Sequence, residues 1–289
     1  MIVGTRGSKL ALAQTNQVNK ALSKLIGDEV KTKIIKTKGD KITNSQLYNM
    51  DSKGLFTKEL DKVVLEEEVD FAVHSLKDVP TDLDEDLEII AIPLRESPNE
   101  VLISQFEWND LKEGASLGSS SLRREAFCNH YEKGFQLKPI RGNIETRIQK
   151  VLKGDVDATI MAEAGLKRLG LTKYIKTKFS TDYIYPAAGQ GAIAIIARKD
   201  CDKKEDIKKL NDYVSFQEVL SEKTILEEVG VGCQWPLGAI AHFNNNQLKL
   251  NSILLNKKGD ILLKTSETGS IRDAEKLGIS IGREMINYI

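Results

Sequence analysis

The sequence predicts an α/β fold with two lobes, followed by a small α+β unit at the C-terminus. Short apolar strands alternate with amphipathic helices over the first two-thirds of the chain, which is the pattern of open α/β sheets. Pro93 and Pro98 interrupt that series, and we expect the chain to cross between lobes there. Beyond residue 212 the pattern changes to alternating strands, a hairpin turn and a terminal helix.

The first lobe is predicted to contain residues 1–94 and 191–212. Apolar residues at helical spacing from Leu10 to Leu25 predict a helix directly after the first strand, and a second helix is expected from about Thr57. The run 191–197 is almost wholly apolar and predicts a buried strand that returns to this lobe. The other strands are expected at 2–5, 31–37, 71–74 and 88–92.

The second lobe is predicted to contain residues 98–188, and the C-terminal unit residues 213–289. The second lobe repeats the alternation of the first, with strands expected at 101–104, 116–119, 136–140 and 158–161 and helices at 122–131 and 144–152. In the C-terminal unit a helix from Asp212 leads to Gly230. Strands at 247–254 and 260–265 flank a turn at 257–260, and a helix follows from about Arg272.

Composition excludes several classes of protein. The 42 basic and 42 acidic side chains cancel, so no overall field favours nucleic acid or a membrane surface, and neither partner is expected. No segment is apolar over the length of a bilayer. Three widely spaced cysteines and three histidines without ligand spacing predict reduced thiols, cytoplasmic residence and no metal site.

The arginines indicate where an anionic ligand binds. The chain has ten arginines against thirty-two lysines, and six of the ten lie in short clusters with serine and glycine. A guanidinium group can bind a carboxylate through two bonds, which an ammonium group cannot do. Two of these clusters follow predicted strands and begin helices, one in each lobe, so we expect a cleft with matched anion sites. The six are Arg6, Arg123, Arg124, Arg141, Arg147 and Arg168.

Two other motifs permit a chemical or a structural interpretation. Asp78, shortly after the strand ending near His74, could donate a proton, but an Asp before Val-Pro is common in turns, and spacing alone favours the turn. His74 is predicted to be a packed strand residue. Cys233 lies near glycines and could be a nucleophile, although a small half-buried apolar role is the commoner one for a single cysteine.

Two glycine-containing segments remain open between a ligand-binding and a structural role. In 51–59 the lysines could add positive charge to the cleft, or Thr57 could simply cap a helix that leaves Lys58 in solvent. The segment 186–191 could be a ligand loop or a hinge, and the residues favour neither.

Taken in order, these segments resemble the porphobilinogen deaminase family over nearly the whole chain. The series is highly specific, although the last fifty or so residues match by pattern more than by motif. The matching segments are Thr5–Ser8, Ser52–Phe56, His74–Pro80, Ser120–Arg124, Arg141–Asn143, Ala164–Gly170, Pro186–Gly191 and Gly232–Gln234.

The resemblance implies a fold and a reaction. The fold has two lobes like those of type II periplasmic binding proteins and a third domain that carries a cofactor. The reaction adds four porphobilinogen molecules, each with loss of ammonia, to a covalently bound dipyrromethane primer, and hydrolysis then releases hydroxymethylbilane. A monomer is implied, with porphobilinogen as the small-molecule substrate.

The resemblance also implies roles for residues, and it reverses the spacing-based interpretations of Asp78 and Cys233. Cys233 would form the thioether to dipyrromethane, and Asp78 would assist protonation and stabilise the methylene-pyrrolenine cation left when ammonia departs. The implied cofactor-binding residues are Arg123, Arg124, Lys77, Ser75, Ser119, Ser120 and Ser121. The implied substrate-binding residues are Arg6, Arg141, Arg147, Arg168, Lys53, Phe56 and Gln190.

Some residues depart from the family pattern, and one other class of protein fits the lobes. Glu163 occupies a usually uncharged position, Trp235 stands where a smaller aliphatic residue is usual, and Asn49 replaces a lysine found in some relatives. A noncatalytic two-lobed receptor for an anionic metabolite would suit the two lobes equally well. It would not need Cys233 or a third domain.

Overall fold

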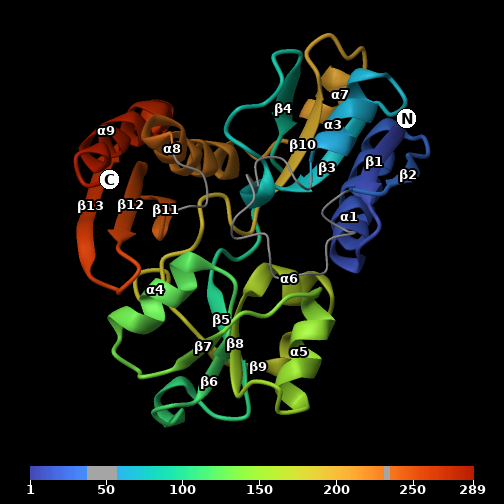
Figure 1. The fold of residues 1–289 in the computed structure, drawn as a ribbon. Helices are drawn as coiled ribbons and strands as arrows, with labels where there is room; N and C mark the ends of the chain where they lie inside the picture. Colours follow the sequence, from blue (N-terminus) through green and yellow to red (C-terminus); the bar gives the residue numbers. More distant parts are fainter. Residues whose placement is uncertain (38–56, 231–234) are drawn as a thin grey trace. The chain divides into compact units, whose positions relative to one another are not determined.

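The structure is a computed structural model that describes residues 1–37, 57–230 and 235–289 (Figure 1). These residues form two compact units. The first contains Met1–Glu96 and Gly191–Phe216, and the second contains Ser97–Gln190 and Gln217–Ile289. The first unit ends at residues 96 and 216, close to the predicted lobe ends at 94 and 212. A separate domain at 213–289 stays a prediction.

A five-stranded mixed sheet forms the centre of the first unit. The strand order is β2-β1-β3-β10-β4, in which β1 is parallel to β2 and β3, and β10 is antiparallel to β3 and β4. The strands are β1 (Ile2–Arg6), β2 (Lys31–Ile35), β3 (Phe71–Ser75), β4 (Leu87–Ala91) and β10 (Ile193–Arg198). The helices are α1 (Lys9–Ile26), α3 (Lys58–Leu65) and α7 (Lys204–Lys208).

Both faces of this sheet are covered, which explains why β10 is apolar up to its last residue, Arg198. Val18 and Leu22 of α1 and Ile207 of α7 pack with Val3 and Ile195 in one apolar cluster. The opposite side of β1 meets α3, because a Cβ on Gly4 would lie 3.6 Å from Leu60. The strand expected at 191–197 is therefore confirmed as the buried strand β10.

The sheet of the second unit repeats this plan. Its strand order is β7-β6-β8-β5-β9, in which β6 is parallel to β7 and β8, and β5 is antiparallel to β8 and β9. The strands are β5 (Glu100–Ser104), β6 (Ser116–Gly118), β7 (Gln136–Lys138), β8 (Ala158–Ala162) and β9 (Ile175–Lys178). The helices are α4 (Leu122–His130), α5 (Ile144–Leu152) and α6 (Glu163–Arg168).

The C-terminal residues form a three-stranded antiparallel sheet with two helices. These elements are α8 (Tyr213–Val229), β11 (Leu237–Asn244), β12 (Gln247–Leu255), β13 (Ile261–Gly269) and α9 (Ala274–Ile286). Residues of α8, α9 and the sheet share one apolar cluster, and Trp235 packs against it. Ile240 and Ile253 also join the core around Phe127 of α4, so this sheet belongs to the same compact unit as the second lobe.

The predicted α/β class is confirmed, and most elements lie within a few residues of their expected positions. The structure contains two strands, β9 and β11, that the sequence analysis did not identify. The sequence of β9, Ile-Lys-Thr-Lys, is short and half charged, and β11 follows directly after Trp235 and Pro236. Among the described residues, no helix has the length and apolar character needed to cross a membrane.

Candidate active site

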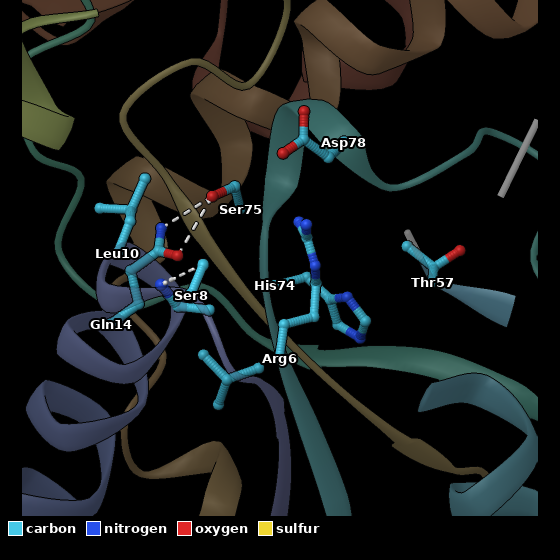
Figure 2. A pocket seen from close by; sticks show the side chains of 10 residues that line it. Arg6, Ser8, Leu10, Gln14, Thr57, His74, Ser75 and Asp78 are labelled. Carbon is cyan, nitrogen blue, oxygen red and sulfur yellow. Dashed lines mark hydrogen bonds between the residues drawn. The ribbon is translucent and has the colours of Figure 1, made fainter. Parts of the chain in front are cut away.

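The first unit contains a small polar pocket of about 60 Å³. Its lining combines an arginine, a carboxylate, an imidazole, an amide and hydroxyl groups. The polar residues are Arg6, Ser8, Gln14, Thr57, His74, Ser75 and Asp78. Figure 2 shows the guanidinium group of Arg6 directed toward the side of the pocket where Asp78 lies. The structure therefore brings the predicted residues Arg6, Ser75 and Asp78 together in one pocket.

Parallel strands explain why these residues meet. Arg6 is the last residue of β1 and Ser75 the last residue of β3, and the two strands are parallel neighbours. Their carboxyl ends lie at the same edge of the sheet, where ligands of open α/β sheets bind. A short 3-10 turn at Leu76–Asp78 then places Lys77 and Asp78 just beyond that edge, with the Asp78 side chain exposed.

The start of α1 supplies two further polar groups. Ser8 caps the helix by accepting a hydrogen bond from the backbone N–H of Ala11 at 3.2 Å. One helical turn further on, Nε2 of Gln14 donates to Oγ of Ser75 at 2.9 Å (Figure 2). Gln14 is 2% exposed, so this bond fixes the predicted ligand-binding hydroxyl of Ser75. Gln14 was not among the predicted site residues, because a glutamine within a predicted helix has no local signal that marks it as part of a site.

His74 is packed in β3, as predicted, and it also lines the pocket. Its side chain is 5% exposed, and Nε2 has no hydrogen-bond partner among the described residues. Burial and the charge of Arg6 lower the pKa of His74 to about 4. The ring is therefore neutral near pH 7 and can hydrogen-bond to a ligand without adding charge.

We expect His74 to make the protein less stable in acid. In the unfolded chain it takes up a proton near pH 6.5, but in the folded chain only near pH 4, so protonation favours unfolding. The contribution of the neutral His74 ring to the unfolding free energy is fully present above pH 6.5 and is lost as the pH falls toward 4. Between pH 7.5 and 5 the wild type should lose about 2 kcal/mol more unfolding free energy than His74→Gln.

Urea denaturation at the two pH values measures this difference. The exposed residue His242 provides the matched control. The variant His242→Gln should lose as much stability on acidification as the wild type. An equal loss in His74→Gln would contradict the assignment of a neutral buried ring.

A second polar cluster lies in the second unit, and strand direction again explains it. The strands β6, β7 and β8 are parallel neighbours, so their carboxyl ends lie at one edge of the sheet. The segments that follow these three ends contain all the predicted ligand residues of this lobe except Gln190. They are Ser119–Arg124 after β6, Arg141–Arg147 after β7 and Glu163–Arg168 after β8.

The side chains of Arg123 and Arg124 bind a carboxylate of the protein itself. They are 6% and 8% exposed, and both contact Glu100 at the start of β5, which has no exposed surface. Nε and Nη2 of Arg124 donate to the two oxygens of Glu100 at 3.1 and 2.9 Å, and Nη2 of Arg123 donates to Oε1 at 2.5 Å. The Nε/Nη2 edge of Arg124 is thus bound by Glu100 rather than left for a ligand.

The remaining groups of this cluster are partly engaged by the backbone. The hydroxyl of Ser120 donates to the carbonyl of Ile140 at 2.9 Å, and Oγ of Ser119 accepts from the N–H of Ser121 at 3.0 Å. Nε of Arg147 donates to the carbonyl of Gly142 at 2.9 Å. Arg141 is half-buried, and no hydrogen bond of its side chain is found within the described ranges.

Glu163 and Arg168 lie at the two ends of the short helix α6. Glu163 is 6% exposed, accepts a hydrogen bond from Ser97 and pairs with Lys178 at 2.8 Å. Ser97 and Lys178 thus stabilise the negative charge of Glu163, at a position that is usually uncharged in the family that the sequence resembles. Arg168 is half-buried at the end of the helix.

Gln190 has a structural role in this arrangement. It is 0% exposed, and Nε2 donates to the carbonyl of Pro98 at 2.8 Å. Both residues lie where the chain enters or leaves the second unit. The hydrogen bond therefore links the two points at which the chain enters and leaves the second unit. The Gln190 side chain has no exposed surface with which to make the substrate contact that the resemblance implied.

Two family models match the chain. One is described as "Porphobilinogen deaminase, dipyromethane cofactor binding domain" and matches residues 1–206, and the other as "Porphobilinogen deaminase, C-terminal domain" and matches residues 216–287. A probable porphobilinogen deaminase of Methanothermobacter thermautotrophicus is 57% identical over 289 residues, which is 100% of both chains. The chain belongs to the porphobilinogen deaminase family.

Other relatives agree with this assignment. The porphobilinogen deaminase of Carboxydothermus hydrogenoformans is 41% identical over 291 residues, with 99% of this chain and 93% of the relative covered. As a family member the chain is a transferase of the hydroxymethylbilane synthase type, with dipyrromethane as its cofactor. It joins four porphobilinogen molecules to this primer, with loss of ammonia, and releases hydroxymethylbilane by hydrolysis.

Several solved structures of binding proteins resemble this fold, with TM-scores below 0.5. A periplasmic substrate-binding protein from Coxiella burnetii is 13% identical at a TM-score of 0.46, over 73% of this chain and 91% of its own. The methionine-binding protein MetQ is 10% identical at a TM-score of 0.45, over 77% and 96%. The alternative of a noncatalytic receptor rests on this likeness alone, which carries no functional argument.

Three predicted site residues, Lys53, Phe56 and Cys233, lie outside the described residues, as does Asn49. The other two cysteines are buried. Burial raises the pKa of the Cys128 thiol to about 12, and burial also raises the pKa of Cys201. Neither thiol is activated for covalent attachment, because the thiolate is the nucleophile.

Proposed function

We propose that the pocket of the first unit is where the enzyme performs its proton transfers, with Asp78 as the catalytic residue. One observation carries the proposal: Asp78, Arg6 and the neutral ring of His74 line the same pocket at the carboxyl ends of two parallel strands. The carboxylate of Asp78 is exposed there and can approach a bound pyrrole. No other described carboxylate lines this pocket.

Asp78 would act on the substrate in two ways. It can deliver a proton as the amine departs, and its negative charge stabilises the positive charge that develops on the pyrrole when ammonia leaves. Arg6, in the same pocket, would bind a carboxylate of the substrate and orient it. Oγ of Ser75, held by Gln14, would be a fixed hydrogen-bonding group for the same ligand.

The residues fit a ligand with many carboxylates. Each pyrrole unit carries an acetate and a propionate, and the two clusters supply guanidinium, ammonium and hydroxyl groups, which are donors that suit carboxylates. Nη1 of Arg124 makes no hydrogen bond to the described residues, and Arg141 is half-buried at the same sheet edge. Dipyrromethane supplies the covalent acceptor to which the first porphobilinogen is added.

We assign the cofactor and the substrate to separate sets of residues. Cys233 would form the thioether to dipyrromethane, because the other two thiols are buried and have raised pKa values. The residues proposed to bind the cofactor are Arg123, Arg124, Lys77, Ser75, Ser119, Ser120 and Ser121. The residues proposed to bind incoming substrate are Arg6, Arg141, Arg147, Arg168, Lys53 and Phe56. We further propose that the enzyme acts as a cytoplasmic monomer.

Turnover of porphobilinogen tests this function. We expect the purified chain to consume porphobilinogen, release one ammonia for each molecule consumed, and form one linear tetrapyrrole for every four. Ammonia and tetrapyrrole are measured in the same reaction, with heat-denatured protein as the control. Binding of porphobilinogen without release of ammonia would contradict the proposal and would favour a receptor.

A further inference from the structure

Glu100 is a buried carboxylate to which the sequence analysis assigned no role. It is the first residue of β5 and pairs in the sheet with Ala162, the last residue of β8. Its side chain is 0% exposed and accepts three hydrogen bonds, all from the guanidinium groups of Arg123 and Arg124. Arg123 also donates to the backbone carbonyl of Tyr185. One carboxylate thus holds both arginines proposed to bind the cofactor.

The energetics favour this pairing. Two guanidinium groups from adjacent residues repel each other, and burying them without a counter-ion is costly. Burial alone would raise the pKa of Glu100, but the charges of Arg124 and Arg123 outweigh it and lower the pKa to about 2. The carboxylate therefore stays ionised at any pH at which the enzyme works. Glu100, Arg123 and Arg124 together carry two positive charges and one negative charge, which is one net positive charge for these three side chains.

We propose that Glu100 is a positioning residue that acts as an internal counter-ion and limits how tightly Arg123 and Arg124 bind the carboxylates of the pyrrole chain. It occupies the Nε/Nη2 edge of Arg124 and leaves the N–H groups of Nη1 for a ligand. Guanidinium groups whose charge is partly balanced by a neighbouring carboxylate hold an anion less tightly than two unopposed guanidinium groups. The carboxylates are thus bound loosely enough to be released. The inference rests on the proposed role of these two arginines.

The isosteric variant Glu100→Gln tests this proposal, with sulfate as the probe. Removal of the counter-charge adds one positive charge to the site, so sulfate should inhibit the variant at a concentration lower by on the order of fivefold. The KM for porphobilinogen should fall together with kcat, because the growing chain is held too tightly. Glu100→Asp keeps the charge and should restore sulfate sensitivity to near the wild-type value.

A second buried carboxylate provides the matched control. Glu222 in α8 of the same unit is also 0% exposed, but it accepts hydrogen bonds from the backbone N–H groups of Gly189 and Ala241 at 2.7 and 2.9 Å. The variant Glu222→Gln leaves Glu100 and its two arginines in place. It should therefore show wild-type sulfate inhibition even if its thermal midpoint falls.

If Glu100→Gln is too unstable for an activity assay, thermal unfolding in the presence of sulfate tests the proposal instead. Sulfate should raise the midpoint of Glu100→Gln more steeply than that of the wild type or of Glu222→Gln, because the bound anion supplies negative charge that the variant lacks near the two arginines. Unchanged sulfate inhibition and KM in a folded variant would overturn the proposal. A midpoint that responds to sulfate as in Glu222→Gln would overturn it as well. Loss of turnover in the wild type, by contrast, would refute the proposed function itself.

Discussion

Replacement of Asp78 by asparagine is expected to lower kcat by at least about a hundredfold, the usual contribution of a general acid or of charge stabilisation in a transition state. The amide has nearly the same shape as the carboxylate but cannot deliver a proton or stabilise positive charge. Asp78 is exposed in the pocket at the end of a 3-10 turn, so folding should be unaffected. Steady-state kinetics and the thermal midpoint are measured together.

A nearby carboxylate outside the pocket controls for a general effect of charge. Glu85 is exposed and does not line the pocket, so Glu85→Gln should keep wild-type kcat. Near-full activity in Asp78→Asn would show that another group performs the proton transfer. If Asp78→Asn is largely unfolded at the assay temperature, the loss of activity would reflect a structural role of Asp78 instead.

Replacement of Cys233 by serine is expected to abolish turnover, because a hydroxyl is a far weaker nucleophile than a thiolate near neutral pH. Without the thioether, the chain has no primer on which to build the tetrapyrrole. The variant should fold, and its intact mass should equal that of the polypeptide alone. Continued consumption of porphobilinogen over many turnovers would contradict the assignment of the anchor.

Cys201 offers the matched control for this substitution. It is 8% exposed, and its sulfur contacts the backbone carbonyl of Asp70 at 3.7 Å in the first unit. The variant Cys201→Ala should retain the added mass and the activity, at some cost in stability from the lost packing. Loss of the added mass in this variant would place the attachment elsewhere.

The sequence predicted the fold well wherever periodicity is strong. Helix α1 was identified because its apolar residues recur at helical spacing, and strand β10 because a short, almost wholly apolar run is typical of a buried strand. Strand β9 was missed because four alternating residues with two lysines carry too little signal. The shared core of α4 with Ile240 and Ile253 is a contact between distant segments, which no local pattern encodes.

The candidate site was predicted partly from the residues and partly from the resemblance. Arg6 was selected as a clustered arginine after a predicted strand, whereas Ser75 and Asp78 were assigned to the site only by the family resemblance. The parallel strands β1 and β3 explain why the three lie together. Glu100 could not be found, since it precedes an apolar strand and looks like an ordinary charged residue before a buried segment. Its role depends on two arginines more than twenty positions away. A search for charged residues at the starts of buried strands could have identified it.

The most direct test is the intact mass of the purified wild-type enzyme, followed by mass mapping of the peptide that contains Cys233. The account predicts an addition equal to two pyrrole units, located on that peptide and absent from the peptides of Cys128 and Cys201. An active enzyme whose Cys233 peptide is unmodified would contradict the account.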